Sequence, residues 1–207
     1  MTLQITLSYI LASLLITPVV LLLIVFIFRR YVVGCGAAQR QGELTVGFFH
    51  PFCNSGGGGE RVLWQYVRTL QLANPHQRII IYTGDKESNQ EILQKAQDRF
   101  NLPPVPNCIP IEFVRLRYRR LVTAELYPRF TMVGQSIGSM ILGVEALWAA
   151  TPDVFVDTTG FAFTYPIAKL FGCFVHCYTH YPTISSDMLS LVFERRESYN
   201  NSSGVAH

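Results

Sequence analysis

The chain opens with a long apolar segment and then alternates between short apolar runs and segments with helical periodicity. None of the first 28 residues is charged, and residues 7–28 are predominantly apolar. At a rise of about 1.5 Å per residue, a helix of this length crosses a hydrocarbon core of roughly 30 Å. We therefore predict a transmembrane anchor over residues 1–30.

The charges that flank this segment predict its orientation. Arg29, Arg30 and Arg40 follow the apolar run at residues 7–28, and no basic residue precedes it. Because basic residues are retained on the cytoplasmic side, the rest of the chain should be cytosolic. The alternative is a cleaved secretory signal with small residues at 34–38, but such signals start with basic residues and have a shorter apolar centre. Five cysteines without a framework spacing favour a reducing compartment.

Beyond a polar linker at residues 31–42, apolar runs typical of buried strands alternate with segments of helical periodicity. The predicted strands cover residues 44–50, 78–83, 109–116, 153–157 and 173–179, and the predicted helices cover residues 59–73, 90–100, 131–150 and 163–171. This alternation predicts an α/β fold with a Rossmann-like, doubly wound parallel sheet. We assign residues 43–190 to this domain and residues 191–207 to a polar tail.

Two features of the domain are candidates for contact with a membrane. The helix over residues 131–150 carries one charge, Glu145, and three glycines whose spacing permits close approach of another segment. We interpret it as a buried or membrane-leaning helix and not as a second span, because the glycines weaken it and the glutamate is costly in hydrocarbon. A basic cluster faces either anionic lipid, a lipid diphosphate or solvent. It comprises Arg115, Arg117, Arg119 and Arg120.

Length and composition limit the remaining possibilities. A chain of 207 residues has room for about one domain and an anchor, and a two-domain enzyme does not fit. With 49% hydrophobic and 15% charged residues and a net charge of +3, neither disorder nor binding of nucleic acid is expected. Function must therefore come from local features.

The most specific local feature is a glycine run between the first strand and the first helix. Its members are Gly56, Gly57, Gly58 and Gly59. Because glycines have no Cβ atoms, a ligand phosphate can approach their backbone N–H groups and the positive end of the helix dipole. A tight turn is the alternative, but it needs only one or two glycines. The run matches neither a Walker A loop nor a dinucleotide-binding loop. We predict that it contacts a phosphate or a sugar.

The two residues after the glycines are further candidates for substrate binding. Arg61 is unfavourable beside the positive end of a helix dipole, so a nearby anion would ease its position. Glu60 either contacts the substrate or pairs locally.

Polar side chains also follow the last two predicted strands, at the sheet edge where ligands of open α/β sheets bind. His180 is a candidate catalytic residue, because an imidazole donates to a sugar hydroxyl or to developing charge near neutral pH. Asp157 and Thr158 suit hydrogen bonding to a sugar or diphosphate. The alternatives are a satisfied strand-end histidine and a capping turn.

A zinc site is not expected, although two cysteines and two histidines lie close together in the sequence. They are Cys173, His176, Cys177 and His180. Side chains alternate along a strand, so the cysteines face one side and the histidines the other. Four ligands would not converge on one tetrahedral ion, and we predict no metal.

Four segments together resemble glycosyltransferase family 4, and within it the α-1,2-mannosyltransferases of the asparagine-linked glycosylation pathway. They are HPFCNSGGGGERVLW (50–64), IIIYTGD (79–85), DTTGFAFTYP (157–166) and YTHYPTIS (178–185). The resemblance implies the N-terminal half of a GT-B fold, a GDP-mannose donor and a diphospho-dolichol-linked oligosaccharide acceptor at the cytosolic face of the endoplasmic reticulum membrane. It also implies retaining transfer without a metal or cofactor, with the glycine run beside the phosphates and His180 beside the transferred sugar. Other mannosyltransferases of the pathway are candidate partners.

The chain departs from this family in its C-terminal part. The second half of the GT-B fold, with its paired-glutamate motif, does not follow, and residues 191–207 resemble nothing in the family. We therefore expect little or no activity from this chain alone. An alternative is a non-catalytic, membrane-anchored subunit that pairs with a donor-binding half. A nicotinamide oxidoreductase is disfavoured, because the glycine register is wrong and only Asp85 follows the second strand.

Overall fold

The computed structural model describes residues 44–179, together with residues 17, 20, 23, 24, 27, 28, 31 and 190. Most of the predicted anchor and linker lies outside the described residues, and so do His180 and the tail at 191–207. The predictions made for these segments therefore stay predictions.

Within residues 44–179, every predicted strand and helix is present. The strands are β1 (Thr45–Phe49), β2 (Arg78–Thr83), β3 (Glu112–Arg115), β4 (Val154–Asp157) and β5 (Phe174–Cys177). The helices are α2 (Gly58–Ala73), α3 (Asn89–Phe100), α4 (Thr131–Ala149) and α5 (Thr164–Leu170), with two short 3-10 turns, η1 (Arg119–Val122) and η2 (Ala124–Leu126). The third strand is shorter than predicted.

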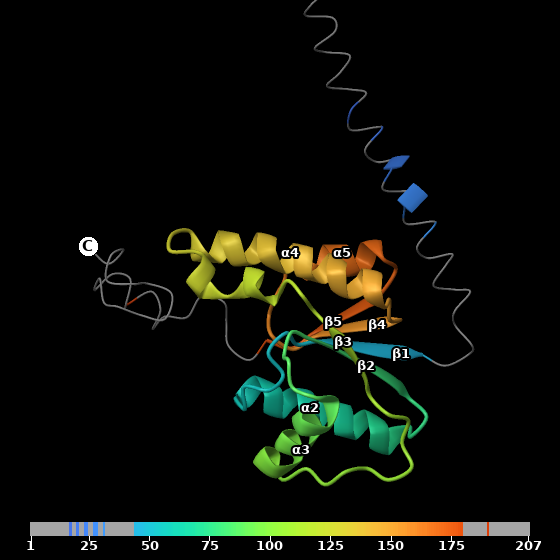
Figure 1. Cartoon of the computed structure of the whole chain (residues 1–207). Helices are drawn as coiled ribbons and strands as arrows, with labels where there is room; N and C mark the ends of the chain where they lie inside the picture. The colour runs from blue at the N-terminus through green and yellow to red at the C-terminus, as the bar shows by residue number, and fades with distance from the viewer. Residues whose placement is uncertain are drawn as a thin grey trace, which may run out of the picture.

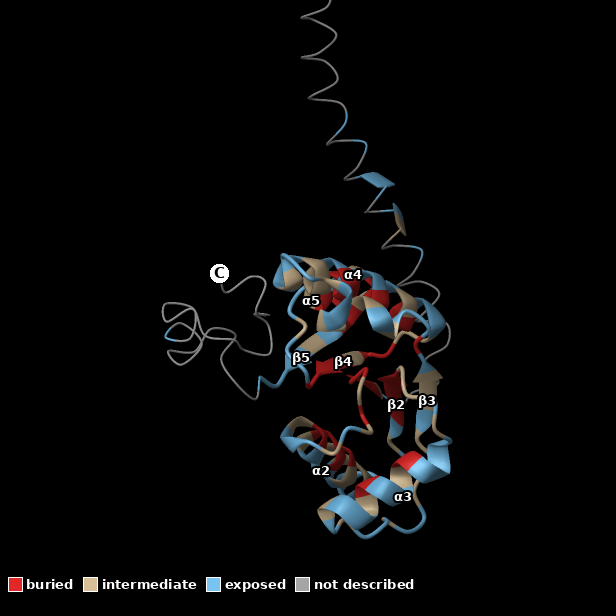
Figure 2. Ribbon diagram, turned by 60° about the vertical axis from the view of Figure 1, so that its left-hand side comes forward, coloured by how far each residue is buried: buried red, intermediate tan, exposed pale blue. Residues whose placement is uncertain are grey.

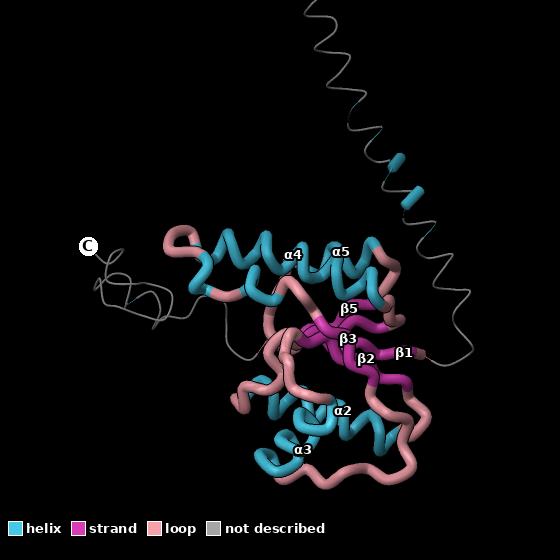
Figure 3. Tube along the Cα trace, viewed as in Figure 1, coloured by secondary structure: helices cyan, strands magenta, loops and turns pink. Residues whose placement is uncertain are grey.

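The five strands form one parallel sheet in the order β3-β2-β1-β4-β5. Helices α2 and α3 cover one face of the sheet, and α4 and α5 cover the other (Figures 1 and 3). The predicted α/β fold with a parallel sheet is confirmed, and its order is that of a Rossmann-like half. The strand order reverses between β1 and β4, and ligands of such sheets bind at the carboxyl ends of the strands at this switch point.

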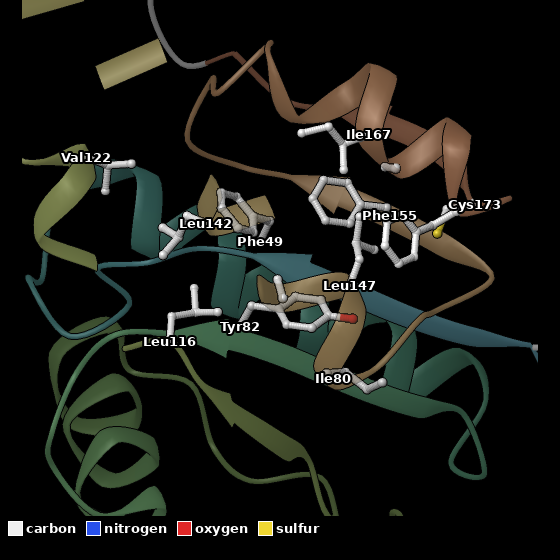
Figure 4. Close-up of a cluster of buried hydrophobic side chains, with 13 residues drawn as sticks. Phe49, Ile80, Tyr82, Leu116, Val122, Leu142, Leu147, Phe155, Ile167 and Cys173 are labelled. Atoms are coloured by element: carbon white, nitrogen blue, oxygen red, sulfur yellow. The ribbon is translucent and has the colours of Figure 1, made fainter. Parts of the chain in front are cut away.

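Each strand supplies side chains to two cores, one on each face of the sheet. On the α4–α5 side, the aromatic rings of Phe49, Tyr82 and Phe155 lie in one cluster with Leu147 of α4 (Figure 4). The ring centroids are 5.5 and 6.3 Å apart for the two pairs that include Phe155. The buried Tyr82 hydroxyl is satisfied, because it donates to the Ala150 carbonyl at 2.7 Å.

The second core lies between the sheet and the α2–α3 layer. It takes the alternate strand residues, including Phe48, and the inner face of α2, including Leu63 and Trp64. Buried residues gather in the central strands and on the inward faces of the helices (Figure 2). Because both faces of β1 and β2 are covered, these strands read in the sequence as almost continuous apolar runs.

Among the described residues, α4 is the one helix long and apolar enough to cross a membrane. Its inner face, with Leu142, Ala146 and Leu147, is buried in the core on the sheet. Two of its glycines permit close packing: a Cβ at Gly138 would collide with the Leu121 carbonyl oxygen of η1, and one at Gly143 would lie 3.3 Å from the Thr164 side chain of α5. The helix therefore uses its glycines to pack within the domain.

We predict that Gly138→Ala lowers the free energy of unfolding by about 2 kcal/mol, because the new methyl group meets backbone that cannot rotate away. The matched control is Gly143→Ala, where a side-chain methyl group can yield by a few tenths of an ångström. Urea denaturation followed by circular dichroism measures both variants. Equal losses of stability would contradict the close packing of η1 on Gly138.

Candidate functional site

A hydrogen bond joins the two strands at the switch point. His50 directly follows β1 and Thr158 directly follows β4, and the His50 Nδ1 and Thr158 Oγ1 atoms lie 2.6 Å apart. Both residues are buried. His50 was predicted only as the end of a strand, although His180 was predicted as a site residue because it is a polar side chain at the carboxyl end of a buried strand.

Glu60, in the first turn of α2, extends this contact to the glycine run. Its Oε2 atom accepts the Gly57 N–H at 2.8 Å, and its Oε1 atom lies 3.7 Å from His50 Nε2. Burial alone would raise the pKa of the Glu60 carboxyl, but the contact with His50 and the backbone N–H bonds hold this pKa below its ordinary value. Of the two roles that the sequence left open for Glu60, the structure shows local pairing. We call His50, Gly57, Gly59, Glu60 and Thr158 the switch-point cluster.

Different structural constraints explain why glycine occurs at the successive positions of the run. Gly56 has a φ of +79°, which favours glycine, and it borders a cavity of about 500 Å³ with Lys95 and Arg99 of α3. At Gly57 a Cβ would lie 2.9 Å from Glu60 Oε2. Turn geometry therefore accounts for Gly56, and the approach of the carboxylate accounts for Gly57.

Neither turn geometry nor a close side-chain contact requires glycine at the position of Gly59. A Cβ there would meet His50 Cε1 at 3.8 Å and the Thr158 carbonyl oxygen at 3.9 Å, which are ordinary van der Waals contacts. Helix geometry leaves the N–H groups of the first turn, including Gly58 and Gly59, without an intrahelical acceptor. The absence of a side chain at Gly59 thus keeps these donors accessible between the ends of β1 and β4.

Asp157, at the end of β4, forms the turn that follows this strand. Its carboxylate accepts the Thr159 N–H at 2.9 Å, the Thr159 hydroxyl at 2.8 Å and the Gly160 N–H at 3.0 Å. It also accepts the Tyr165 hydroxyl at 2.7 Å, and burial together with this bond raises the pKa of Tyr165. The capping role that the sequence left open for Asp157 is the one observed, while Thr158 contacts His50.

Asp85 connects the loop after β1 to the end of β2 through hydrogen bonds. Its Oδ2 atom accepts the Asn54 N–H and the Thr83 hydroxyl, each at 3.0 Å, and its Oδ1 atom pairs with Arg119 of η1. The buried Cys53 thiol donates to Thr83 Oγ1 at 3.2 Å, and burial raises the pKa of this thiol to about 12. The thiol therefore stays protonated, and the loop that carries the glycines has a fixed starting point.

The other predicted site residues lie apart from the switch-point cluster. Arg61 is exposed and borders an open surface groove along α2. His180 lies outside the described residues, directly after Thr179. Because Asp157 of β4 pairs with Cys177 of β5, the end of β5 leads to the same sheet edge. Within the described part of the chain, no three His, Cys, Asp or Glu side chains are grouped to hold a metal, and the predicted absence of a metal stays a prediction.

The parallel sheet, its switch point and the glycine-rich helix start define an α/β domain of the Rossmann-like class. The chain belongs to the family described as ALG11 mannosyltransferase N-terminus, whose model matches residues 43–207. The match therefore includes the tail at 191–207. No solved structure matches the chain.

Several curated relatives carry the name GDP-Man:Man(3)GlcNAc(2)-PP-Dol alpha-1,2-mannosyltransferase. The chain is 48% identical to the one from Dictyostelium discoideum over 83% of its own length and 34% of the relative's. It is 50% identical to the one from Xenopus laevis over 79% and 33%, and 49% identical to the human one over 80% and 33%. The resemblance to the mannosyltransferases of this pathway is thus confirmed. The chain spans about a third of the length of the curated relatives it matches.

We predict that Glu60→Gln lowers the free energy of unfolding by about 2 kcal/mol at neutral pH, because the charge-assisted bond to the Gly57 N–H and the contact with His50 weaken. The folded-state pKa of Glu60 is below its ordinary value of 4.5. The stabilisation by the carboxylate is therefore complete above that value and is lost as the pH falls through the folded-state pKa.

Denaturation curves at a series of pH values measure this difference between Glu60→Gln and the unmodified chain. The gap should be widest at neutral pH and close in acid. Glu125→Gln, at an exposed position, is the control. A gap that widens as the pH falls would show that the Glu60 carboxylate does not stabilise the fold.

Proposed function

We propose that this chain forms the N-terminal, Rossmann-like half of a GT-B α-1,2-mannosyltransferase that moves mannose from GDP-mannose to a diphospho-dolichol-linked oligosaccharide. The observation that carries the proposal is the helix start at Gly58 and Gly59, opposite His50 and Thr158 at the switch point. The sequence identity of 48–50% to relatives named as mannosyltransferases of this kind supports the choice of substrates.

In this proposal the N–H groups of Gly58 and Gly59 donate to a diphosphate oxygen, aided by the positive end of the α2 dipole. The Glu60 carboxylate would repel an anion, but its bond to the Gly57 N–H and its contact with His50 offset part of that charge. The diphosphate therefore approaches from the side of Gly59. His180 is proposed to donate to the transferred sugar.

The transfer is proposed to be retaining and metal-independent, and the rest of the donor site would lie in the portion of the relatives that this chain does not span. We therefore expect the 207-residue chain to transfer little or no mannose by itself. A fusion of residues 1–190 to the unmatched remainder of the Dictyostelium relative provides the missing portion for an assay.

The first experiment measures transfer of labelled mannose from GDP-mannose to Man(3)GlcNAc(2)-PP-Dol by this fusion. We predict activity in the fusion and a loss of about 100-fold in kcat/KM for Gly59→Ala, because a methyl group displaces the reacting groups by an ångström or so. A Cβ at this position makes only ordinary van der Waals contacts, so unfolding does not explain a loss.

Ser55→Ala, at an exposed position of the same loop, is the matched control. Full activity of Gly59→Ala would refute the site, whereas a folded fusion without any transfer would refute the proposed function. Transfer by the 207-residue chain alone would show that a second half is not needed.

We also propose a single-pass location in the endoplasmic reticulum membrane with the domain in the cytosol. Asn200 and Asn201 each begin a glycosylation sequon, and in the cytosol both should remain unmodified. The test is a gel shift on endoglycosidase treatment of the chain expressed in eukaryotic cells. As a control, a cleavable secretory signal replaces residues 1–30, which should lead to glycosylation. A shift in the unmodified chain would mean that the domain is lumenal.

A further inference from the structure

The outer face of α4 is as apolar as the face that packs on the sheet. Its exposed residues recur at helical spacing along the whole helix: Val133, Ile137, Met140, Ile141, Val144 and Trp148. Ile137 is 56% exposed and Trp148 is 69% exposed. A surface helix of a soluble domain places polar residues at such positions. On α2, across the sheet, the outward positions carry Arg61, Gln65 and Thr69.

The single charge of α4 does not interrupt this face. Glu145 accepts the backbone N–H groups of Arg117 and Tyr118, at 2.8 and 3.2 Å, and is thereby held against the segment that follows β3. The apolar face also continues past the N-terminal end of α4, where Phe130 is 83% exposed. Contiguous exposed apolar surface of this kind marks a site of contact with a protein or a membrane.

Exposed arginines lie on the segments next to α4. Arg117 and Arg120 lie on the segment that packs along α4, and Arg129 lies two residues before the helix. Arg117 and Arg120 follow the carboxyl end of β3, so they lie toward the same sheet edge as the switch-point cluster. An apolar helix face bordered by basic residues is the composition of helices that lie in the plane of a membrane surface.

The N-terminal segment meets the domain on this side. Phe28 packs edge-on against Phe171, at the end of α5, with ring centroids 5.4 Å apart. Four other described residues of this segment, Val20, Leu23, Ile24 and Ile27, are apolar and exposed. The contact of Phe28 with Phe171 brings this segment to the α4–α5 side of the sheet. A bilayer that holds this segment would therefore face the α4–α5 layer.

We propose that the outer face of α4 docks into the surface layer of a bilayer that contains anionic phospholipid. Phe130, Ile137, Ile141 and Trp148 enter the region beneath the headgroups, and the flanking arginines bind lipid phosphates. The helix lies parallel to the membrane and does not cross it, because its inner face is part of the protein core. This contact fixes the orientation of the sheet relative to the membrane surface, independently of the sugar chemistry.

The test uses the full chain reconstituted into vesicles of phosphatidylcholine and phosphatidylserine that carry brominated acyl chains. The chain has two tryptophans: Trp64 is buried in the core with 4% exposure, and Trp148 lies on the proposed face. We expect bromine close to the headgroups to quench Trp148 emission more strongly than bromine at the bilayer centre. In Trp148→Phe, the quenchable emission should be lost.

Variants of the face test its contribution directly. The double change Ile137→Glu and Ile141→Glu should abolish quenching of Trp148 without lowering the melting temperature, because both positions are already exposed. The matched control is Leu72→Glu, at a position of α2 that is 56% exposed on the other side of the sheet, and it should leave quenching unchanged. Replacing Arg117, Arg120 and Arg129 by glutamine should reduce quenching in vesicles with phosphatidylserine and not in phosphatidylcholine alone.

Three outcomes would overturn the proposal. The first is Trp148 emission that brominated lipid does not quench in the reconstituted chain. The second is strongest quenching by bromine at the bilayer centre, which would indicate a crossing helix. The third is shielding of Trp148 that depends on protein concentration and not on lipid, which would assign the face to a second copy of the chain.

Discussion

The position of the glycine-rich helix start depends on one buried chain of polar contacts. Thr158, His50 and Glu60 link the end of β4, the end of β1 and the first turn of α2, and Glu60 also accepts the Gly57 N–H. A buried carboxylate is tolerated only where it is paired and hydrogen-bonded, so this contact fixes the rotamer of Glu60 and the starting point of α2 together. The carboxyl edge of the sheet, where the proposed site lies, is thus shaped by polar groups that must be paired for the domain to fold.

The two faces of the sheet have different outer surfaces, and this difference gives the domain an orientation. Both cores are apolar and similar in composition, but α2 presents arginine, glutamine and threonine outward, whereas α4 presents isoleucine, methionine and tryptophan. The contact between Phe28 and Phe171 brings the apolar N-terminal segment to the same side as α4. An isolated soluble domain would not need this asymmetry. It is explained if the α4 side faces a membrane and the α2 side faces water.

The fold was predictable because its signals are local. Buried parallel strands read as apolar runs, and α3 begins with Ser88 and Glu91, a capping box visible in the sequence. The turns η1 and η2 were not predicted, because they depend on packing against α4, such as the approach of Leu121 to Gly138. β3 was predicted too long at its start, where Pro110 has no N–H to donate to β2.

In the candidate site, too, features that depend on residues far apart in the sequence could not be predicted. The glycine run, Asp157 and Thr158 were placed correctly at the carboxyl edge of the sheet, but the role of His50 rests on a partner 108 residues away that no local pattern reveals. Four consecutive glycines look equivalent in the sequence. In the structure, Gly56 is needed for its positive φ and Gly57 for the close approach of a side chain, whereas neither constraint applies to Gly59. A glycine that neither turn geometry nor packing requires is the one whose conformational cost needs another explanation. Access to the helix N–H groups between His50 and Thr158 is the explanation that the geometry offers.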